Sequence, residues 1–428
     1  MPVTCVFGAQ WGDEGKGKVV DYLADGADYV VRYQGGANAG HTIRVGDESF
    51  ALRLTPSGVL RGSIGVIANG VVIDPRVLLE EMELVAARGI RPEDSLRISD
   101  RAHLVLPFHP PLDRALDAAR SDAWRVGTTG RGVSTAIADK HSYDGFRVID
   151  LMSERMRAER LPYLLERGNE RLRTAGAEPL DLTATLAEIE SWVPRLRPMV
   201  CDTVALLHRA REEDRTVLLE GAQASLLDVD FGTYPFTTSS NTGVAGVASG
   251  TGLPARAVDR VLAVAKAYTT RVGRGPFPTE EKGEVGRRLQ EYGCEFGTVT
   301  GRPRRCGWFD AVGVRHVCRL NGVDGIALTK IDVLSGIDPL RICVAYQVDG
   351  RVIEDFPADP DVLGRCEPIY QDVPGFMESL TDARSVDDLP ERARAYVAAL
   401  EQQVGARVEI LSVGPERTET VAMGAPGA

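Results

Sequence analysis

A glycine-rich segment near the start of the chain carries the residue types that bind phosphate groups. Its sequence is Gly8-Ala9-Gln10-Trp11-Gly12-Asp13-Glu14-Gly15-Lys16-Gly17-Lys18. Glycine lets backbone N–H groups turn toward an anion, a following helix adds partial positive charge, and a lysine adds a full charge. The pattern resembles a phosphate-binding loop, but no Ser or Thr follows its lysine to hold magnesium.

Two carboxylates, Asp13 and Glu14, lie inside this segment. A carboxylate beside a polyphosphate is electrostatically unfavourable unless it binds Mg²⁺ or takes part in proton transfer. The same pattern is also typical of a glycine-rich turn with exposed acids. The segment alone therefore leaves both interpretations open.

The elements around this loop predict an α/β fold. Short apolar runs predict strands at 3–7, 29–33, 64–68, 217–220, 261–265, 326–329 and 341–346. Helical patterns occur at 17–24, 76–88, 112–120, 152–173, 186–211 and 389–403, with Pro162, Pro194 and Pro198 expected to break the middle region. Such alternation favours a large central, mostly parallel sheet with surrounding helices and helical or loop insertions, and polar loops at strand ends gather ligands.

Composition narrows the class of protein. The chain has 428 residues, 43% hydrophobic and 26% charged, and a net charge of −11. A protein with this negative net charge is not expected to bind nucleic acid or an anionic membrane. Seven irregularly spaced cysteines without a CxxC pair indicate reduced thiols rather than a disulfide framework or zinc site. With no signal-peptide pattern and no membrane-spanning run, we expect a cytoplasmic protein.

Further polar motifs follow in order along nearly the whole chain. They occupy 34–42, 98–103, 127–132, 220–223, 232–235, 239–242, 268–273, 300–308 and 328–332. Together with 10–18 they resemble the motifs of the adenylosuccinate synthetase family. Many ordered motifs over one length are far more specific than any one of them.

The resemblance implies a single domain over residues 1–428 with a P-loop-like GTP-binding architecture. Its approximate parts are 1–100 (phosphate loop and sheet), 101–215 (helical insertion with the acceptor-nucleotide loop) and 216–428 (sheet continuation, amino-acid loop and guanine-binding part). The implied reaction joins L-aspartate to IMP and gives adenylosuccinate, GDP and phosphate through a 6-phosphoryl-IMP intermediate. The implied cofactor is Mg²⁺ and the implied assembly is a homodimer.

The resemblance also assigns catalytic roles. Asp13 matches the base, His41 the acid and Gln223 a further catalytic residue, while Asp13 and the Gly40 carbonyl match magnesium ligands. His41 alone would be better explained as a loop histidine bonded to backbone. Its neighbours at 38–40 and the presence of Asp13 favour the catalytic interpretation.

Nucleotide and amino-acid contacts are implied in the same way. The matched GTP positions are Gly12, Glu14, Gly15, Lys16, Gly17, Lys18, Gly40, Thr42, Lys330, Asp332, Ser412 and Gly414. The matched IMP positions are Asp13, Asn38, Thr129, Gln223, Thr238 and Arg302. The matched aspartate positions are Val272, Val299, Thr300, Arg302 and Arg304. By itself, the segment 329–332 would be better explained as an ordinary strand end.

Three positions depart from the family pattern. Residues 133–137 are Val-Ser-Thr-Ala-Ile where the family usually has Ile-Gly-Pro-Ala-Tyr. Tyr143 replaces an arginine that reaches the nucleotide phosphate of a partner subunit, and Arg147 is a possible substitute. Val299 replaces a threonine of the aspartate loop. These changes surround the acceptor and the amino acid, whereas the phosphate loop, Asp13 and His41 are intact.

Three alternatives follow from this pattern. A specialised paralogue would carry out the same phosphoryl activation and amination on an IMP-like nucleotide or with another amino acid. A GTPase switch would need the phosphate loop and guanine motif but not the motifs at 127–132 and 300–305. A catalytically dead binding protein would not need both Asp13 and His41.

Overall fold

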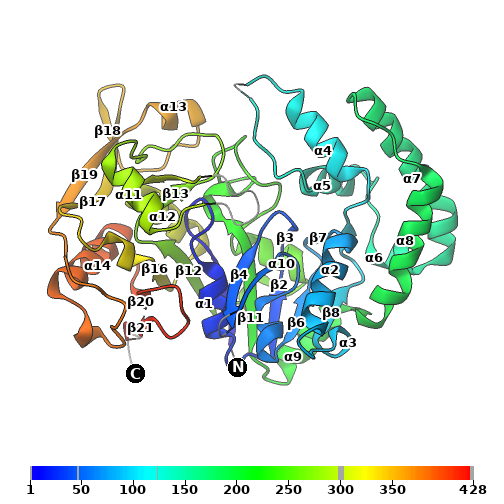
Figure 1. The fold of residues 1–428 in the computed structure, drawn as a ribbon, viewed down its shortest axis with the longest axis horizontal. Helices are drawn as coiled ribbons and strands as arrows, with labels where there is room; N and C mark the ends of the chain where they lie inside the picture. Colours follow the sequence, from blue (N-terminus) through cyan, green and yellow to red (C-terminus); the bar gives the residue numbers. More distant parts are fainter. Residues whose placement is uncertain (1, 46–47, 123, 297–302, 425–428) are drawn as a thin grey trace.

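The computed structural model describes residues 2–45, 48–122, 124–296 and 303–424. For residues 41–45 and 48–50 it describes the backbone alone. A ten-stranded sheet runs through the centre of the molecule (Figure 1). In spatial order its strands are β10 (Val200–Cys201), β8 (Leu96–Ser99), β6 (Ile64–Ile67), β2 (Tyr29–Arg32), β11 (Val217–Ala224), β1 (Val3–Gly8), β12 (Arg260–Lys266), β16 (Gly325–Thr329), β20 (Val408–Ser412) and β21 (Thr420–Ala422). Adjacent strands pair in parallel except β20 with β21, so the prediction of a mostly parallel sheet is confirmed.

The central strands are apolar on both faces because the sheet is covered on both sides. Helix α1 (Lys16–Leu23) packs Val19 and Val20 against Val6 and neighbouring strands on one face. A larger cluster, which includes Cys5 and Phe7, fills the opposite face. Strand β1 therefore lies in the middle of the core and delivers the following loop to the carboxyl edge of the sheet.

Smaller sheets surround the central one. They consist of β3 (Gly35–Gly36), β7 (Val71–Ile73) and β9 (His103–Leu104); β4 (His41–Val45) and β5 (Glu48–Leu52); β13 (Thr269–Arg271) and β14 (Arg305–Gly307); and β15 (Phe309–Asp310), β17 (Leu340–Val348), β18 (Arg351–Ile353) and β19 (Glu367–Val373). The remaining helices are α2 (Pro75–Ala86), α3 (Pro92–Ser95), α4 (His109–Ala118), α5 (Val133–His141), α6 (Val148–Met152), α7 (Glu154–Thr174), α8 (Leu182–Leu196), α9 (Thr203–Glu212), α10 (Ala245–Thr251), α11 (Glu284–Tyr292), α12 (Ala311–Asn321), α13 (Pro360–Arg365) and α14 (Glu391–Val404).

The helical insertion forms one flank of the molecule, with α7 and α8 outermost and α4 and α5 above the sheet (Figure 1). The expected breaks at Pro194 and Pro162 are wrong, because α8 continues through Pro194 and α7 continues through Pro162. Leu161, Leu164 and Leu165 are buried there, and their packing outweighs the hydrogen bond that proline removes. The expected interruption after α8 is confirmed: Pro198 lies in a 3₁₀ turn that leads into β10.

The seven cysteines form no disulfide. None of the helices in the described ranges combines the length and apolar character needed to cross a membrane.

Candidate active site

A cavity of about 650 Å³ opens at the carboxyl edge of the central sheet. The loops that follow β1, β2, β11, β12 and β16 all contribute to its wall, as expected for an open α/β sheet. Predicted site residues that line it are Gly12, Asp13, Gly15, Lys16, Gly17, Lys18, Asn38, Gly40, Thr129, Gln223, Thr238, Val272, Arg304 and Lys330.

Hydrogen bonds to the Glu14 side chain stabilise the phosphate loop. This carboxylate is fully buried and accepts hydrogen bonds from the backbone N–H groups of Gln10 and Gly12 and from Lys16 Nζ, the last at 2.6 Å. A side chain at Gly8 would place its Cβ 2.5 Å from Glu14 Oε2, so the strand must end in glycine there. Glu14 therefore faces the loop interior and does not line the cavity.

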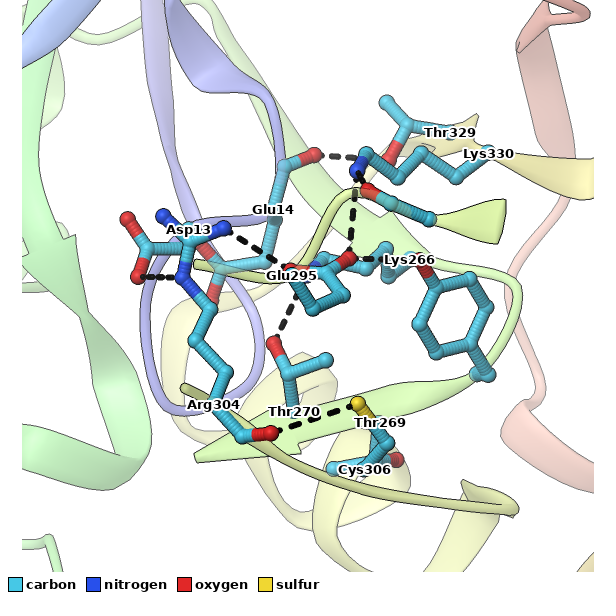
Figure 2. Close-up of polar contacts among 12 residues, drawn as sticks. Asp13, Glu14, Lys266, Thr269, Thr270, Glu295, Arg304, Cys306, Thr329 and Lys330 are labelled. Carbon is cyan, nitrogen blue, oxygen red and sulfur yellow. Dashed lines mark hydrogen bonds and ion pairs between the residues drawn. The ribbon is translucent and has the colours of Figure 1, made fainter. Parts of the chain in front are cut away.

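Asp13 has a left-handed backbone conformation (φ 60°) and a carboxylate that is about one-third exposed at the cavity wall. Arg304 Nε lies 2.7 Å from Asp13 Oδ2 (Figure 2). The Nε–H does not point along this line, so the contact is a charge pair rather than a well-formed hydrogen bond. Burial lowers the pKa of Arg304, but Asp13 and Glu295 more than compensate and hold it above its usual value.

The guanine-motif residues lie at the end of β16. Lys330 has φ 57° and lines the cavity, while its ammonium group donates to the Gly293 carbonyl and to Glu295. Asp332 has a buried Oδ1 with no hydrogen-bond partner, and burial raises the pKa of its carboxyl. An unpartnered buried acceptor suits a ligand that brings its own N–H groups.

The second guanine-side segment is attached to the phosphate loop by Lys18. Its ammonium group donates to Ser412 Oγ at 2.6 Å, to the Gly414 carbonyl at 2.7 Å and to the Glu419 carbonyl at 2.9 Å. Burial lowers the pKa of Lys18 to about 8. Ser412 and Gly414 thus adjoin the loop without lining the cavity.

Three of the predicted acceptor residues, Gln223, Asn38 and Thr238, form a polar chain in the cavity wall. Gln223 Nε2 donates to Asn38 Oδ1 at 2.9 Å, and Asn38 Nδ2 donates to Thr238 Oγ1 at 3.4 Å. Gln223 has φ 54°, and its buried Oε1 has no hydrogen-bond partner. The strained backbone of Gln223 directs its side-chain amide into the cavity, where the amide oxygen can accept a hydrogen bond from a ligand.

Comparisons with known proteins agree along the whole chain. Residues 5–421 match the adenylosuccinate synthetase family model. The chain belongs to the adenylosuccinate synthetase family. The reaction of this family is the GTP-dependent ligation of IMP and aspartate.

Individual relatives support this assignment. Adenylosuccinate synthetases from Moorella thermoacetica and Desulforudis audaxviator are 51% and 50% identical, with 100% and 98% of each chain covered. A fully ligated adenylosuccinate synthetase from Plasmodium falciparum superposes with a TM-score of 0.94 at 36% identity, covering 99% of this chain and 100% of that one. A cyanophage S-2L succinoaminodeoxyadenylate synthetase has a TM-score of 0.61 at 20% identity over 99% and 96% of the two chains, which shows a shared fold only.

Several site residues predicted from the adenylosuccinate synthetase resemblance lie outside the described residues, or have side chains that are not described. Val299, Thr300 and Arg302 fall among residues 297–302. His41 and Thr42 begin strand β4, whose backbone pairs with β5, but their side chains are not described. No group of three or more His, Cys, Asp or Glu suited to a metal occurs within the described ranges.

Some residues in and next to the cavity were missed by the sequence analysis. The clearest are Glu295 and Lys266, both fully buried and in contact with each other at 2.8 Å. Lys266 ends the apolar strand β12, and a charged residue in such a run was an available signal. Arg271 was also missed: its guanidinium lies over Trp11 and donates to Thr233 Oγ1, and burial lowers its pKa to about 9.

Proposed function

We propose that this chain catalyses the GTP-dependent ligation of L-aspartate to IMP, giving adenylosuccinate, GDP and phosphate. The observation that carries the proposal is that one cavity brings together Asp13, the phosphate loop, the acceptor residues and Lys330. A simple GTPase switch has no need of acceptor residues in the same cavity as its phosphate loop.

In the proposed mechanism Asp13 accepts the N1 proton of IMP, which makes the 6-oxygen nucleophilic toward the γ-phosphate of GTP. His41 donates a hydrogen bond to the phosphoryl group as charge develops. The amine of aspartate then displaces phosphate from the activated carbon. Gln223, with its free acceptor in the cavity, orients the purine.

Arginine forks suit a dicarboxylate substrate, and we assign Arg304 to this role together with Thr300 and Arg302. Arg304 is paired with Asp13. Aspartate binding would draw the guanidinium toward the substrate and free Asp13 for proton transfer.

Asp13 and the Gly40 carbonyl are the residues that would hold Mg²⁺. Both line the cavity, and oxygen donors suit this hard cation. When bound, the ion neutralises charge on the GTP phosphates. We further propose a cytoplasmic homodimer.

The test is phosphate release from Mg²⁺-GTP with IMP and aspartate together and with each omitted in turn. The proposal expects release only with all three substrates, and a succinylated nucleotide by mass spectrometry. Release without IMP and aspartate would favour a GTPase, and no release in any mixture would contradict the proposed acceptor.

A specialised acceptor is the second candidate, because Val133, Ser134 and Thr135, which belong to a segment that departs from the family pattern, line the cavity. Ser134, which replaces a glycine of the family pattern, donates to Asp113 at 3.0 Å and so changes how the acceptor loop is held. If IMP fails, the same assay with purine nucleotides that differ at the sugar or base distinguishes this candidate.

A further inference from the structure

A buried carboxylate, Glu295, joins two parts of the site beneath the cavity (Figure 2). Its Oε1 accepts from Lys266 Nζ at 2.8 Å, from Lys330 Nζ at 3.1 Å and from the hydroxyl of Tyr268. Its Oε2 accepts from Arg304 Nη1 at 2.9 Å. The two oxygens of one fully buried side chain therefore hold different partners.

These partners belong to different substrates in the proposed function. Lys330 belongs to the guanine motif, and Arg304 to the aspartate side, where its Nε also contacts Asp13. The contacts form a continuous chain from Asp13 through Arg304 and Glu295 to Lys330 (Figure 2). No other described carboxylate contacts both Lys330 and Arg304.

The charges make this arrangement specific. Burial alone would raise the pKa of Glu295. The nearby ammonium groups of Lys266 and Lys330 outweigh this effect and lower the pKa to about 2, so the carboxylate remains ionised. Lys266 is also fully buried and donates to Thr270 Oγ1 at 2.7 Å. Its ammonium balances part of the charge and leaves Glu295 able to hold both Lys330 and Arg304.

Lys330 and Arg304 need such an anchor because both side chains are long. Lys330 is about one-third exposed, and without Glu295 its ammonium would keep, among the described residues, the Gly293 carbonyl as its one partner. The Arg304 guanidinium would keep Asp13 as its one partner in the described ranges and would lose the contact that fixes its orientation. Both groups would then be ordered by the substrates themselves, which weakens binding.

We propose that Glu295 is a positioning residue that couples guanine-nucleotide binding to aspartate binding. It does so by holding Lys330 on one oxygen and Arg304 on the other. This inference rests on the proposed function, since it takes Arg304 to be an aspartate ligand and Lys330 a guanine ligand. The alternative is an ion cluster that stabilises the fold and has no effect on the substrates.

The test is Glu295→Gln, which keeps the shape and removes the charge. We expect the KM for aspartate to rise about tenfold and that for GTP about fivefold, as loss of charge-assisted hydrogen bonds implies. The KM for IMP should stay within about twofold, because no acceptor residue contacts Glu295. GDP affinity, measured by calorimetry, should fall in parallel with the GTP effect. Aspartate and GTP KM values both within twofold of wild type would overturn the inference.

Two further variants separate positioning from folding. Asp310→Asn alters another buried carboxylate, which accepts from Tyr346 and caps α12 outside the cavity. It should lower thermal stability and leave all three KM values unchanged. The double variant Glu295→Gln with Lys266→Met removes both members of a buried pair, a change that proteins tolerate better than removal of one. It should fold and retain the KM increases, and wild-type KM values in it would contradict the inference.

Failure of the proposed function gives a different result. Wild-type protein that makes no succinylated nucleotide contradicts the function whatever Glu295 does. GDP affinity needs no turnover, so an unchanged GDP affinity in Glu295→Gln contradicts the coupling even if the reaction is confirmed.

Discussion

Asp13 combines a left-handed backbone, a partly exposed carboxylate and a charge contact with Arg304. An asparagine at this position would keep the size of the side chain but could not accept the N1 proton. We expect Asp13→Asn to lower kcat by about 10²- to 10⁴-fold, the range for loss of a general base. Steady-state phosphate release with all three substrates measures this effect.

The matched control for this variant is Asp382→Asn, which changes an exposed carboxylate outside the cavity. It should leave kcat unchanged. Equal activity of Asp13→Asn and wild type would refute the assignment of Asp13 as base.

His103 is predicted to make stability depend on pH. Burial, aided by Lys140 and Arg147, lowers the pKa of this half-buried imidazole from 6.5 to about 4. Between these values the unfolded chain binds a proton that the folded protein does not, so stability is complete above pH 6.5 and falls as the pH drops toward 4. After allowance for partial exposure, the loss attributable to His103 is about 1 kcal/mol.

Urea unfolding of wild type and His103→Gln at pH 7.5 and pH 4.5 measures this contribution. The variant should lose less stability between the two pH values than the wild type does. Identical losses would show that His103 is protonated equally in the folded and unfolded states.

At the scale of elements, α4 positions the acceptor loop. Asp113 on this helix is buried and accepts from Thr128 Oγ1 at 2.9 Å, from the Gly132 N–H at 3.0 Å and from Ser134 Oγ. Asp113→Asn replaces an acceptor oxygen with a donor and should release the loop. We expect the KM for IMP to rise about tenfold, with the KM for GTP within about twofold.

Substrate kinetics with IMP and GTP varied separately measure this difference. Asp94→Asn, at an exposed position on α3, is the control and should alter neither KM. A parallel increase in both KM values would indicate general loss of structure rather than loss of the acceptor loop.

The elements also show how far the sequence determines the result. Apolar runs located six strands of the central sheet (β1, β2, β6, β11, β12 and β16), because a strand covered on both faces must be apolar along its length. They missed β8, β10, β20 and β21 of the same sheet. Helix α5 was missed, since residues 127–135 have the glycine and polar composition of a loop, yet Ala136 and Val133 pack inward. The break at Pro162 was wrongly expected because tertiary packing of α7 cannot be inferred from local propensity.

For the site, too, the sequence predicted what depends on strand ends and not what depends on tertiary contacts. The motif residues that line the cavity are adjacent to strand ends, so their convergence follows from a parallel sheet. Glu295 could not be predicted, because its importance depends on Lys266, Lys330 and Arg304, which meet only in three dimensions. The inward orientation of Glu14 likewise follows from hydrogen bonds within the folded loop.

At the scale of the whole molecule, Tyr143 bears on the proposed homodimer. It is 88% exposed, has φ 68°, and lies two residues after the end of α5. The family pattern places there an arginine directed at the partner subunit's nucleotide. Tyr143→Arg would restore that charge without new backbone strain, because arginine and tyrosine are equally disfavoured at positive φ.

In a dimer of this kind, Tyr143→Arg should lower the KM for IMP about tenfold through a charge-assisted phosphate contact. The gain should disappear at protein concentrations where sedimentation velocity detects only monomer, because the arginine and the phosphate belong to different subunits. Val352→Arg adds the same charge at an exposed site on β18 and should leave the KM unchanged. An unchanged KM for dimeric Tyr143→Arg would mean that position 143 does not face the partner's acceptor site, and that another group, with Arg147 the first to examine, carries the phosphate.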